Sequence, residues 1–493
     1  MKDINFEDFV RDSPQEVQDS DSGDTGQADD AGAAPGGEGN EEGDTDPMDA
    51  LRRSPTVRNL VTVTFTRQEL LQRLREDALR HPADTYRLFG AVMDIDERGG
   101  LAPISAEFDL RDARFSPTGS QEEPELSDKV FPATVAGILG TDNAEGLSIQ
   151  RADLLQRCVD EFHRLAADGT LASVSKAQHA MHVIDRVADP ELSELSSRVT
   201  SALIDGTDTP DFTFQLADEL DRERTRARDL LFSGQDDQAV TVAEAAIERV
   251  ESAYADNPGV PRYFNSYAER VVYNRLFATD GERTVLIPDN LFYAHTELAD
   301  LLSQLKGAKA ALPHLNAMVA YAPAYPFSHM KLAVQLARNE DWDSARAACL
   351  NALRVALDRD DAAFAYYRLA YAEWMRDRFD IAAAAYIMSE HIAPGQIGAL
   401  DGELRELLAR AESQCIAVLT DVESAAGVLR MHDLPVWPHT QVAAIVRDAA
   451  RVCVDEGMFV PARTLSMAAA RMNDGDNGGV DMVQSQFLRS LNS

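Results

Sequence analysis

Small residues recur along the second half of the chain with a period of 34 to 37 residues, and this period constrains the fold more than any other feature. Ala299 and Ala333 are 34 residues apart, and Ala333 and Ala370 are 37 residues apart. A second series follows twelve residues after each of these, at Ala311, Ala345 and Ala382. Alanines at such positions allow two helices to approach closely, and a repeat of this length is typical of stacked helix pairs. We therefore expect a mainly α-helical solenoid with these alanines buried between helices.

Three successive windows share this pattern, and they span residues 292–325, 326–359 and 363–396. An aromatic residue precedes the second helix in two of them (Trp342 and Phe379), and proline closes two of them (Pro323 and Pro394). The middle window has Leu357 where proline is expected. The pattern resembles the tetratricopeptide repeat. The resemblance implies an α-α solenoid, and it implies a non-catalytic scaffold or adaptor for protein–protein interaction.

The repeat region is expected to cover residues 211–493. Weaker windows surround Ala227 and Ala450, so helix pairs are predicted toward both ends of this region. Residues 262–288 fit no window, and the array could be interrupted there. Residues 207–211 contain Thr-Asp-Thr-Pro-Asp, which breaks the helical pattern and marks the boundary with the preceding region.

The first part of the chain divides into an acidic tail and a second, mostly helical region. Residues 1–50 carry a net charge of −14 and little that is large and apolar, so residues 1–55 are predicted to be a disordered tail. Residues 56–210 are predicted to be mostly helical, with a short β element. Strands are expected at Leu60–Phe65 and Ile104–Leu110, a helix after Thr66, and an irregular loop near residues 99–132.

Composition limits the classes of partner. The formal net charge of −36 repels phosphate backbones, so no nucleic-acid partner is expected. No apolar run is long enough to span a membrane, so no membrane insertion is expected. The first residues lack the features of a secretory signal, and the four cysteines are scattered. We expect a cytoplasmic protein, and homo-oligomerisation is possible.

The resemblance also implies a binding site. In this family the first helices of successive repeats line a concave groove for a peptide or helix. The positions that chaperone-tail binders fill with Lys, Asn and Arg are mostly aromatic or apolar here. A foreign partner and another part of the same protein remain equal alternatives for covering these rings. The predicted partner-binding residues are Tyr293, Phe327, Met330, Arg338, Phe364, Tyr367, Arg368, Tyr371 and Trp374.

One short segment has the composition of a ligand for such a groove. Phe6 and Phe9 lie among Glu7, Asp8 and Asp12 near the start of the chain. Apolar residues among acidic ones are usual in short linear motifs that bind a partner. The preferred alternative is a solvated tail that carries a few aromatic residues. We hypothesise that residues 3–12, or a similar motif of a partner, can occupy the groove.

Signals for catalysis, cofactors or metals are weak. His179, His182 and Asp185 recur at three-residue spacing on a predicted helix, but no further ligands surround them, so ordinary histidines are the preferred interpretation. Asp474–Gly479 resembles the start of a calcium loop, but Ser485 stands where the bidentate Glu is needed. We predict no metal, no cofactor and no enzymatic activity. The alternative is an accessory subunit of an enzyme, or an enzyme with its site in residues 56–210.

Overall fold

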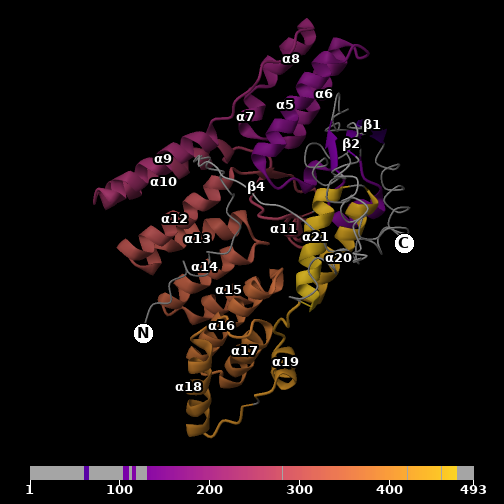
Figure 1. The fold of residues 1–493 in the computed structure, drawn as a ribbon. Coiled ribbons are helices and arrows are strands. Elements are labelled where there is room, and N and C mark those ends of the chain that lie inside the picture. Colours follow the sequence, from indigo (N-terminus) through magenta and orange to yellow (C-terminus); the bar gives the residue numbers. More distant parts are fainter. Residues whose placement is uncertain are drawn as a thin grey trace, which may run out of the picture. The chain divides into compact units, whose positions relative to one another are not determined.

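Helices dominate the part of the chain that the structure, a computed structural model, describes (Figure 1). The chain divides into two compact units, residues 1–53 and 54–493, and all described residues belong to the second. The predicted acidic tail, the helix expected after Thr66 and the calcium-like loop after Asp474 lie outside the described residues. The described ranges are 60–65, 104–109, 114–117, 130–279, 281–418, 420–456 and 458–474.

Both strands predicted in the N-terminal region are confirmed. β1 (Leu60–Phe65) pairs antiparallel with β2 (Ile104–Asp109), so that Leu60 lies opposite Asp109 and Phe65 opposite Ile104. A third strand that was not predicted, β3 (Arg114–Pro117), pairs antiparallel with β2. The alternating β-branched residues of β1 account for its extended conformation, because branching at Cβ restricts the side chain and suits a pleated strand.

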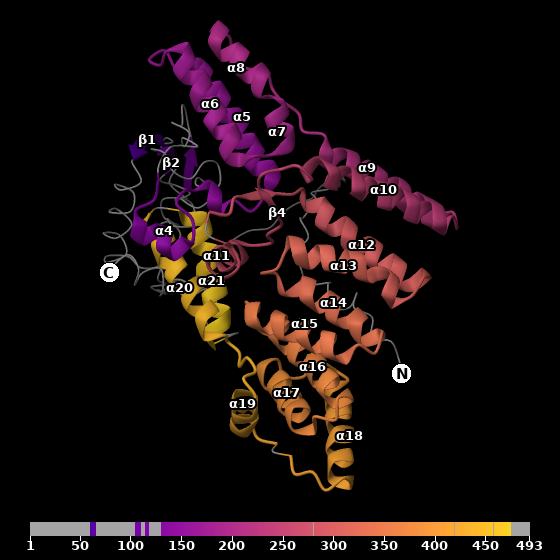
Figure 2. The same cartoon turned by 180° about the vertical axis from the view of Figure 1, so that it is seen from behind.

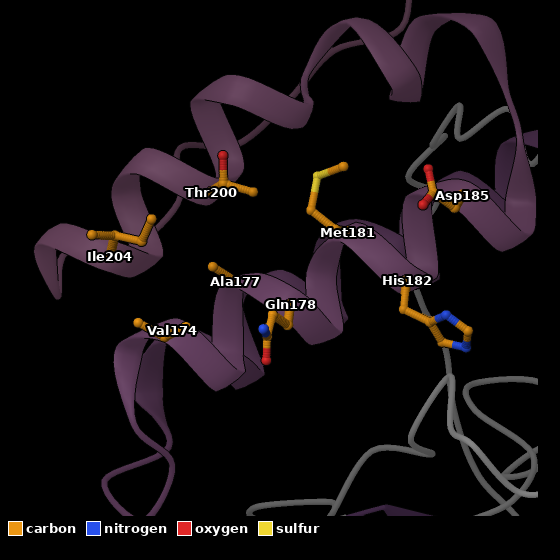
Figure 3. A pocket seen from close by; sticks show the side chains of 8 residues that line it. All are labelled: Val174, Ala177, Gln178, Met181, His182, Asp185, Thr200 and Ile204. Atoms are coloured by element: carbon orange, nitrogen blue, oxygen red, sulfur yellow. The ribbon is translucent and has the colours of Figure 1, made fainter.

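Within the described residues, five α-helices follow the strands in the N-terminal region, and the three longest of them are amphipathic. In the longest of them, apolar residues recur at three- and four-residue spacing and are buried, as expected for a core-facing side: Leu154, Leu155, Cys158, Val159 and Phe162. α6 contacts both α5 and α8, and an open hollow lies between α6 and α8 (Figure 3). The helices are α4 (Ala133–Leu139), α5 (Arg151–Ala167), α6 (Ser173–Val187), α7 (Pro190–Glu194) and α8 (Ser196–Asp205).

The repeat region is built from antiparallel helix pairs that contact one another in chain order (Figure 1). The predicted α-α solenoid is confirmed at this level. The pairs are α9 (Leu216–Phe232) with α10 (Asp236–Tyr254), α12 (Asp289–Leu305) with α13 (Ala308–Tyr321), α14 (Pro326–Arg338) with α15 (Trp342–Val355), and α16 (Arg359–Met375) with α17 (Phe379–Ile392). α18 (Leu400–Ser413) and α19 (Val422–Met431) then pack on α17.

The alanines that defined the period lie where the helices meet. Ala299, Ala333, Ala345, Ala370 and Ala382 are each at most 2% exposed, which confirms their predicted burial. A methyl side chain at these positions brings the two backbones of a pair close together. The second helix of the fourth pair has the most such residues, because four successive alanines of α17, residues 382–385, are all buried.

The predicted interruption of the array is also confirmed. β4 (Val260–Arg262), α11 (Tyr267–Leu276) and β5 (Thr284–Leu286) are inserted between α10 and α12, and the two strands pair in parallel. α11 packs against α4 and against the C-terminal pair α20 (Thr440–Asp455) and α21 (Phe459–Asp474) (Figure 2). One hydrophobic core therefore joins the N-terminal helices, the insertion and the last helix pair.

Polar side chains of α11 hold it against the turn that follows α4. Nε of Arg270 donates a hydrogen bond to the carbonyl oxygen of Gly146 at 2.6 Å, and Nδ2 of Asn274 donates to the carbonyl oxygens of Leu139 and Gly146. Gly140 has a φ of +70°, and a Cβ there would lie 2.7 Å from the Cβ of Asn274. Both the backbone conformation and the close approach therefore require glycine at this position.

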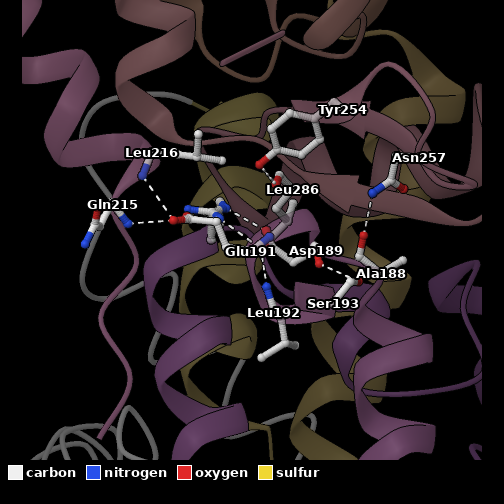
Figure 4. Close-up of polar contacts among 11 residues, drawn as sticks. Ala188, Asp189, Glu191, Leu192, Ser193, Gln215, Leu216, Tyr254, Asn257 and Leu286 are labelled. Carbon is white, nitrogen blue, oxygen red and sulfur yellow. Dashed lines mark hydrogen bonds and ion pairs between the residues drawn. The ribbon is translucent and has the colours of Figure 1, made fainter. Parts of the chain in front are cut away.

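A buried arginine joins the N-terminal helices to the start of the array (Figure 4). Nε and Nη2 of Arg151 donate to the two carboxylate oxygens of Asp189 at 2.6 and 2.9 Å, and Nη2 also donates to Glu191 at 2.7 Å. The other oxygen of Glu191 accepts the backbone N–H groups of Gln215 and Leu216, where α9 begins. Glu191 thus satisfies N–H groups that the helix cannot bond internally.

We predict that an overpacked helix pair will destabilise the array. Replacing Ala333 with Leu should lower the free energy of unfolding by about 1–3 kcal/mol, because the added carbons must force the paired helices apart. Denaturant unfolding measures the loss. Ala320 is exposed on α13, so Ala320→Leu is the matched control and should change the free energy of unfolding by less than about 0.5 kcal/mol. Equal effects of both substitutions would contradict the close packing at Ala333.

A second prediction concerns the first turn of α11. Burial raises the pKa of Glu269 from 4.5 to about 8, although its carboxylate accepts the backbone N–H of Asn265 at 2.9 Å. Between these two pH values the folded chain holds a proton that the unfolded chain releases. This carboxyl group therefore makes the free energy of unfolding fall as pH rises from about 4.5 to 8.

Glu269→Gln should remove this contribution, because an amide resembles the protonated carboxyl group at every pH. The measurement is the free energy of urea unfolding of both chains at constant ionic strength. The variant should gain stability over the original chain as pH rises, by up to about a factor of ten in the unfolding equilibrium constant per pH unit. Parallel curves would show that Glu269 is ionised in the folded chain.

Candidate partner-binding site

The nine residues predicted to bind a partner lie on α12, α14 and α16, the first helices of three successive pairs. Their burial divides them into three groups. Met330, Tyr367 and Trp374 are buried; Phe327, Phe364, Arg368 and Tyr371 are half-buried; Tyr293 and Arg338 are exposed. The sequence pattern placed them on the correct helices, but it did not separate core residues from surface residues.

The half-buried residues of α16 share one face of the helix. Phe364, Arg368 and Tyr371 are separated by four and three residues, and this spacing stacks side chains one above another. Phe327 lies at the start of α14, the preceding first helix, which contacts α16. We call these four residues, Phe327, Phe364, Arg368 and Tyr371, the aromatic face.

The buried rings of α16 pack into the core beside this face. Trp374 meets Tyr371 edge-on at a ring separation of 6.2 Å, and Trp342 meets Tyr371 from the other helix of the preceding pair at 5.8 Å. The hydroxyl of Tyr367 donates to Oε1 of Glu403 on α18 at 3.0 Å. The sequence left open whether a partner or the same chain covers these rings. For Tyr367, α18 of the same chain supplies the contact.

Glu403 also binds a second tyrosine. The hydroxyl of Tyr386 on α17 donates to Oε2 of Glu403 at 2.7 Å, so one carboxylate of α18 joins two helices. Burial raises the pKa of both Tyr367 and Tyr386 above the ordinary range, and the nearby carboxylate adds to the rise. Both hydroxyls are therefore neutral donors that fix α18 in place.

Tyr293 belongs to a different aromatic cluster. Its hydroxyl lies 3.2 Å from that of Tyr263, whose ring stacks on Phe292 at 4.3 Å. Tyr325 connects this cluster to the aromatic face, because its ring lies 5.8 Å from Phe292 and 5.6 Å from Phe327. The sequence missed Tyr263 and Tyr325, since the first lies in the interruption of the repeats and the second lies just before α14.

Two cations accompany the aromatic rings. Nζ of Lys331 lies 5.7 Å from the ring centre of Phe327, and the guanidinium of Arg368 lies 5.0 Å from that of Phe364 and 5.3 Å from that of Tyr367. Such contacts stabilise a cation over the face of a ring. Lys331 was not predicted, although its position four residues after an aromatic residue is a signal the sequence contains.

Two side-chain donors in or beside the aromatic face lack an acceptor among the described residues. Nε of Arg368 and Nε1 of Trp374 are buried, and neither finds a hydrogen-bond acceptor in the part of the chain that the structure describes. Buried donors are normally paired, because an unpaired one loses the hydrogen bonds it makes in water. Within the aromatic face, Arg368 therefore adds a donor without a described acceptor to the three apolar rings.

The same surroundings do not favour nucleophilic chemistry. Cys349 is buried on α15, in electrostatic contact with Arg368. Burial raises the pKa of its thiol to about 12, so the thiol stays protonated at neutral pH. A thiol in this state is a weak nucleophile, and Cys349 functions as a small apolar core residue.

The hollow between α6 and α8 is a second concave feature, with a volume of about 430 Å³ (Figure 3). Val174, Ala177 and Met181 line it from α6, and Ile204 lines it from α8. The side chains of His182 and Asp185 also border it, but they point in opposite directions in Figure 3. Polar groups that converge on one point of a pocket would favour the alternative of an enzyme site in residues 56–210. His182 and Asp185 do not converge in this hollow.

The three residues considered for metal binding have separate surroundings. Nε2 of His179 lies 3.1 Å from a carboxylate oxygen of Glu161, while His182 and Asp185 border the hollow. Among the described residues, no group of three His, Cys, Asp or Glu side chains is placed to hold a metal ion.

Comparison with known proteins found no protein-family model that matches the chain and no curated protein with a similar sequence. Within the described ranges, every helix is too short or too polar to cross a lipid bilayer.

We predict that Trp374 is a core residue. Trp374→Ala should lower the free energy of unfolding by about 3–5 kcal/mol, because it empties the space of a large buried ring. Phe364→Ala should cost clearly less, since that ring is half-buried. Denaturant unfolding compares the two variants. If Trp374→Ala lowers the free energy of unfolding no more than Phe364→Ala does, Trp374 belongs to the aromatic face and not to the core.

Proposed function

We propose that the protein is a non-catalytic scaffold or adaptor whose TPR-like repeats bind a peptide or helix of a protein partner on the aromatic face. The observation that carries the proposal is the half-burial of Phe327, Phe364 and Tyr371 on two neighbouring first helices. Each ring is held by the core on one side and leaves part of its surface to solvent. Partner proteins bury such rings, and aromatic residues dominate the energetics of interfaces.

Rigid support favours this use of the face. Tyr371 is fixed by ring contacts with Trp342 and Trp374, and Phe364 lies 6.4 Å from Tyr367. Side chains that are already ordered lose little rotamer freedom when a partner binds, so more of the contact energy appears as affinity.

The proposal places the scaffold in the cytoplasm. The four cysteines, all within the described ranges, form no disulfide, and three of them, Cys158, Cys349 and Cys453, are buried. Free thiols are usual in reducing compartments, where disulfides are rare.

A defined peptide tests the proposal. The probe is a synthetic peptide with the sequence of residues 1–14, which combines two phenylalanines with four acidic residues. The protein is the full chain with Phe6→Ala and Phe9→Ala, so that its own copy of the motif does not compete. Calorimetric titration should detect binding, and Phe364→Ala or Tyr371→Ala should each weaken it by about 30-fold, the effect of removing an interface hot spot.

Phe232 provides the matched control, because it is 85% exposed at the end of α9. Phe232→Ala removes the same type of side chain and should leave the affinity unchanged. Equal affinity in the Phe364→Ala, Tyr371→Ala and parent chains would place the partner site elsewhere. No binding at millimolar peptide would reject this segment as a ligand of the protein.

A further inference from the structure

The two neighbouring first helices present the same pair of side chains at equivalent positions. Phe327 and Lys331 on α14 correspond to Phe364 and Arg368 on α16, and both residues of the pair are shifted by 37 residues. In each pair the cation lies over the phenylalanine ring, at 5.7 Å on α14 and 5.0 Å on α16. Two neighbouring first helices, α14 and α16, therefore each place a cation over an aromatic ring.

The two cations differ in their counter-ions. Nζ of Lys331 contacts both carboxylate oxygens of Asp300, on the preceding first helix, at 2.7 Å. Asp300 on α12 and Val334 on α14 occupy equivalent positions, because these two helices are offset by 34 residues in the repeat. The helix that precedes Arg368 thus offers an apolar side chain where the helix that precedes Lys331 offers a carboxylate.

Among the described residues, Arg368 makes no ion pair that corresponds to the one between Lys331 and Asp300. The nearby carboxylate of Glu403 accepts hydrogen bonds from two tyrosines, and that of Glu373 is bound by Arg346 and Arg376. The guanidinium of Arg368 is held between Phe364 and Tyr367, and its buried Nε has no described acceptor. A half-buried guanidinium without an ion pair can donate hydrogen bonds to a carboxylate that reaches it.

We propose that Arg368 binds a carboxylate of the partner, so that the aromatic face selects an acidic segment with an aromatic or large apolar residue beside the acid. The carboxylate would take the place at Arg368 that Asp300 takes at Lys331. This inference rests on the proposed function, because it names the chemistry of the segment bound at the same face. Charge complementarity identifies the occupant: the rings take the apolar residue and the unpaired guanidinium takes the Asp or Glu side chain.

The experiment selects ligands from a random dodecapeptide phage library on the immobilised full chain. Peptides selected on the original chain should be enriched in Asp or Glu adjacent to an aromatic or large apolar residue. A synthetic peptide of the consensus sequence is then compared with its Asn/Gln counterpart by calorimetry. The acidic form should bind about tenfold more tightly, as expected for a hydrogen-bonded charge pair.

The repeat itself supplies the decisive variant. Val334→Asp places a carboxylate where Asp300 stands in the preceding repeat, so Arg368 should gain an internal partner and the preference for acidic peptides should disappear. Val334→Asn adds a side chain of the same size without charge and should keep the preference. Arg368→Gln should abolish it, whereas Arg378→Gln, at an exposed arginine of the next loop, should not.

Each outcome decides the inference. Selected peptides that carry aromatic residues without acids would overturn it and leave the proposed function standing. An acidic preference that survives in both Val334→Asp and Arg368→Gln would assign the carboxylate to another cation and would also overturn it. Failure to select any peptide on the original chain would reject the proposed function, and this inference with it.

Discussion

Close approach of paired helices is the constraint on which the array depends. The alanines at the contact positions have almost no exposed surface, and α17 buries four in succession. Helices that approach this closely leave no room for longer side chains at the alanine positions themselves. Trp342 and Phe379 stand at the first positions of α15 and α17, beside the turns. The small contact residues and these two aromatic residues thus occupy different parts of each pair.

The insertion at residues 260–286 gives the array a second set of contacts. A simple solenoid connects each pair only to its neighbours, and its ends share no core. Here α11 leaves the stack and packs on α4, α20 and α21, so that residues from both ends of the described chain enter one hydrophobic core. Asn274 and Arg270 add hydrogen bonds to the turn after α4. The parts of this region are therefore expected to unfold cooperatively rather than pair by pair.

Much of this architecture could be predicted from the sequence, because the signals are local. Helical periodicity and the β-branched run at Leu60–Phe65 depend on neighbouring residues, and the alanine spacing links each helix pair only to the next one. The interruption after Arg262 was visible as a lack of pattern, but its contacts were not, since α11 meets helices more than 120 residues away in either direction. The C-terminal pair looked like a further repeat for the same reason. Its packing on α4 and α11 depends on distant residues that the pattern does not record.

The candidate site shows the same limit at the scale of one helix. The spacing of Phe364, Tyr367, Tyr371 and Trp374 correctly placed them on one broad stripe of α16, but burial of each depends on α15, α17 and α18. Glu403 on α18 covers Tyr367, and Trp342 on α15 supports Tyr371. The stripe is therefore divided lengthwise, with one edge in the core and the other on the surface. The residues proposed to face a partner therefore lie on a helix whose opposite side is fixed by core packing. A ligand that binds there meets side chains already in place, and its affinity reports the chemistry of the face rather than the cost of ordering it.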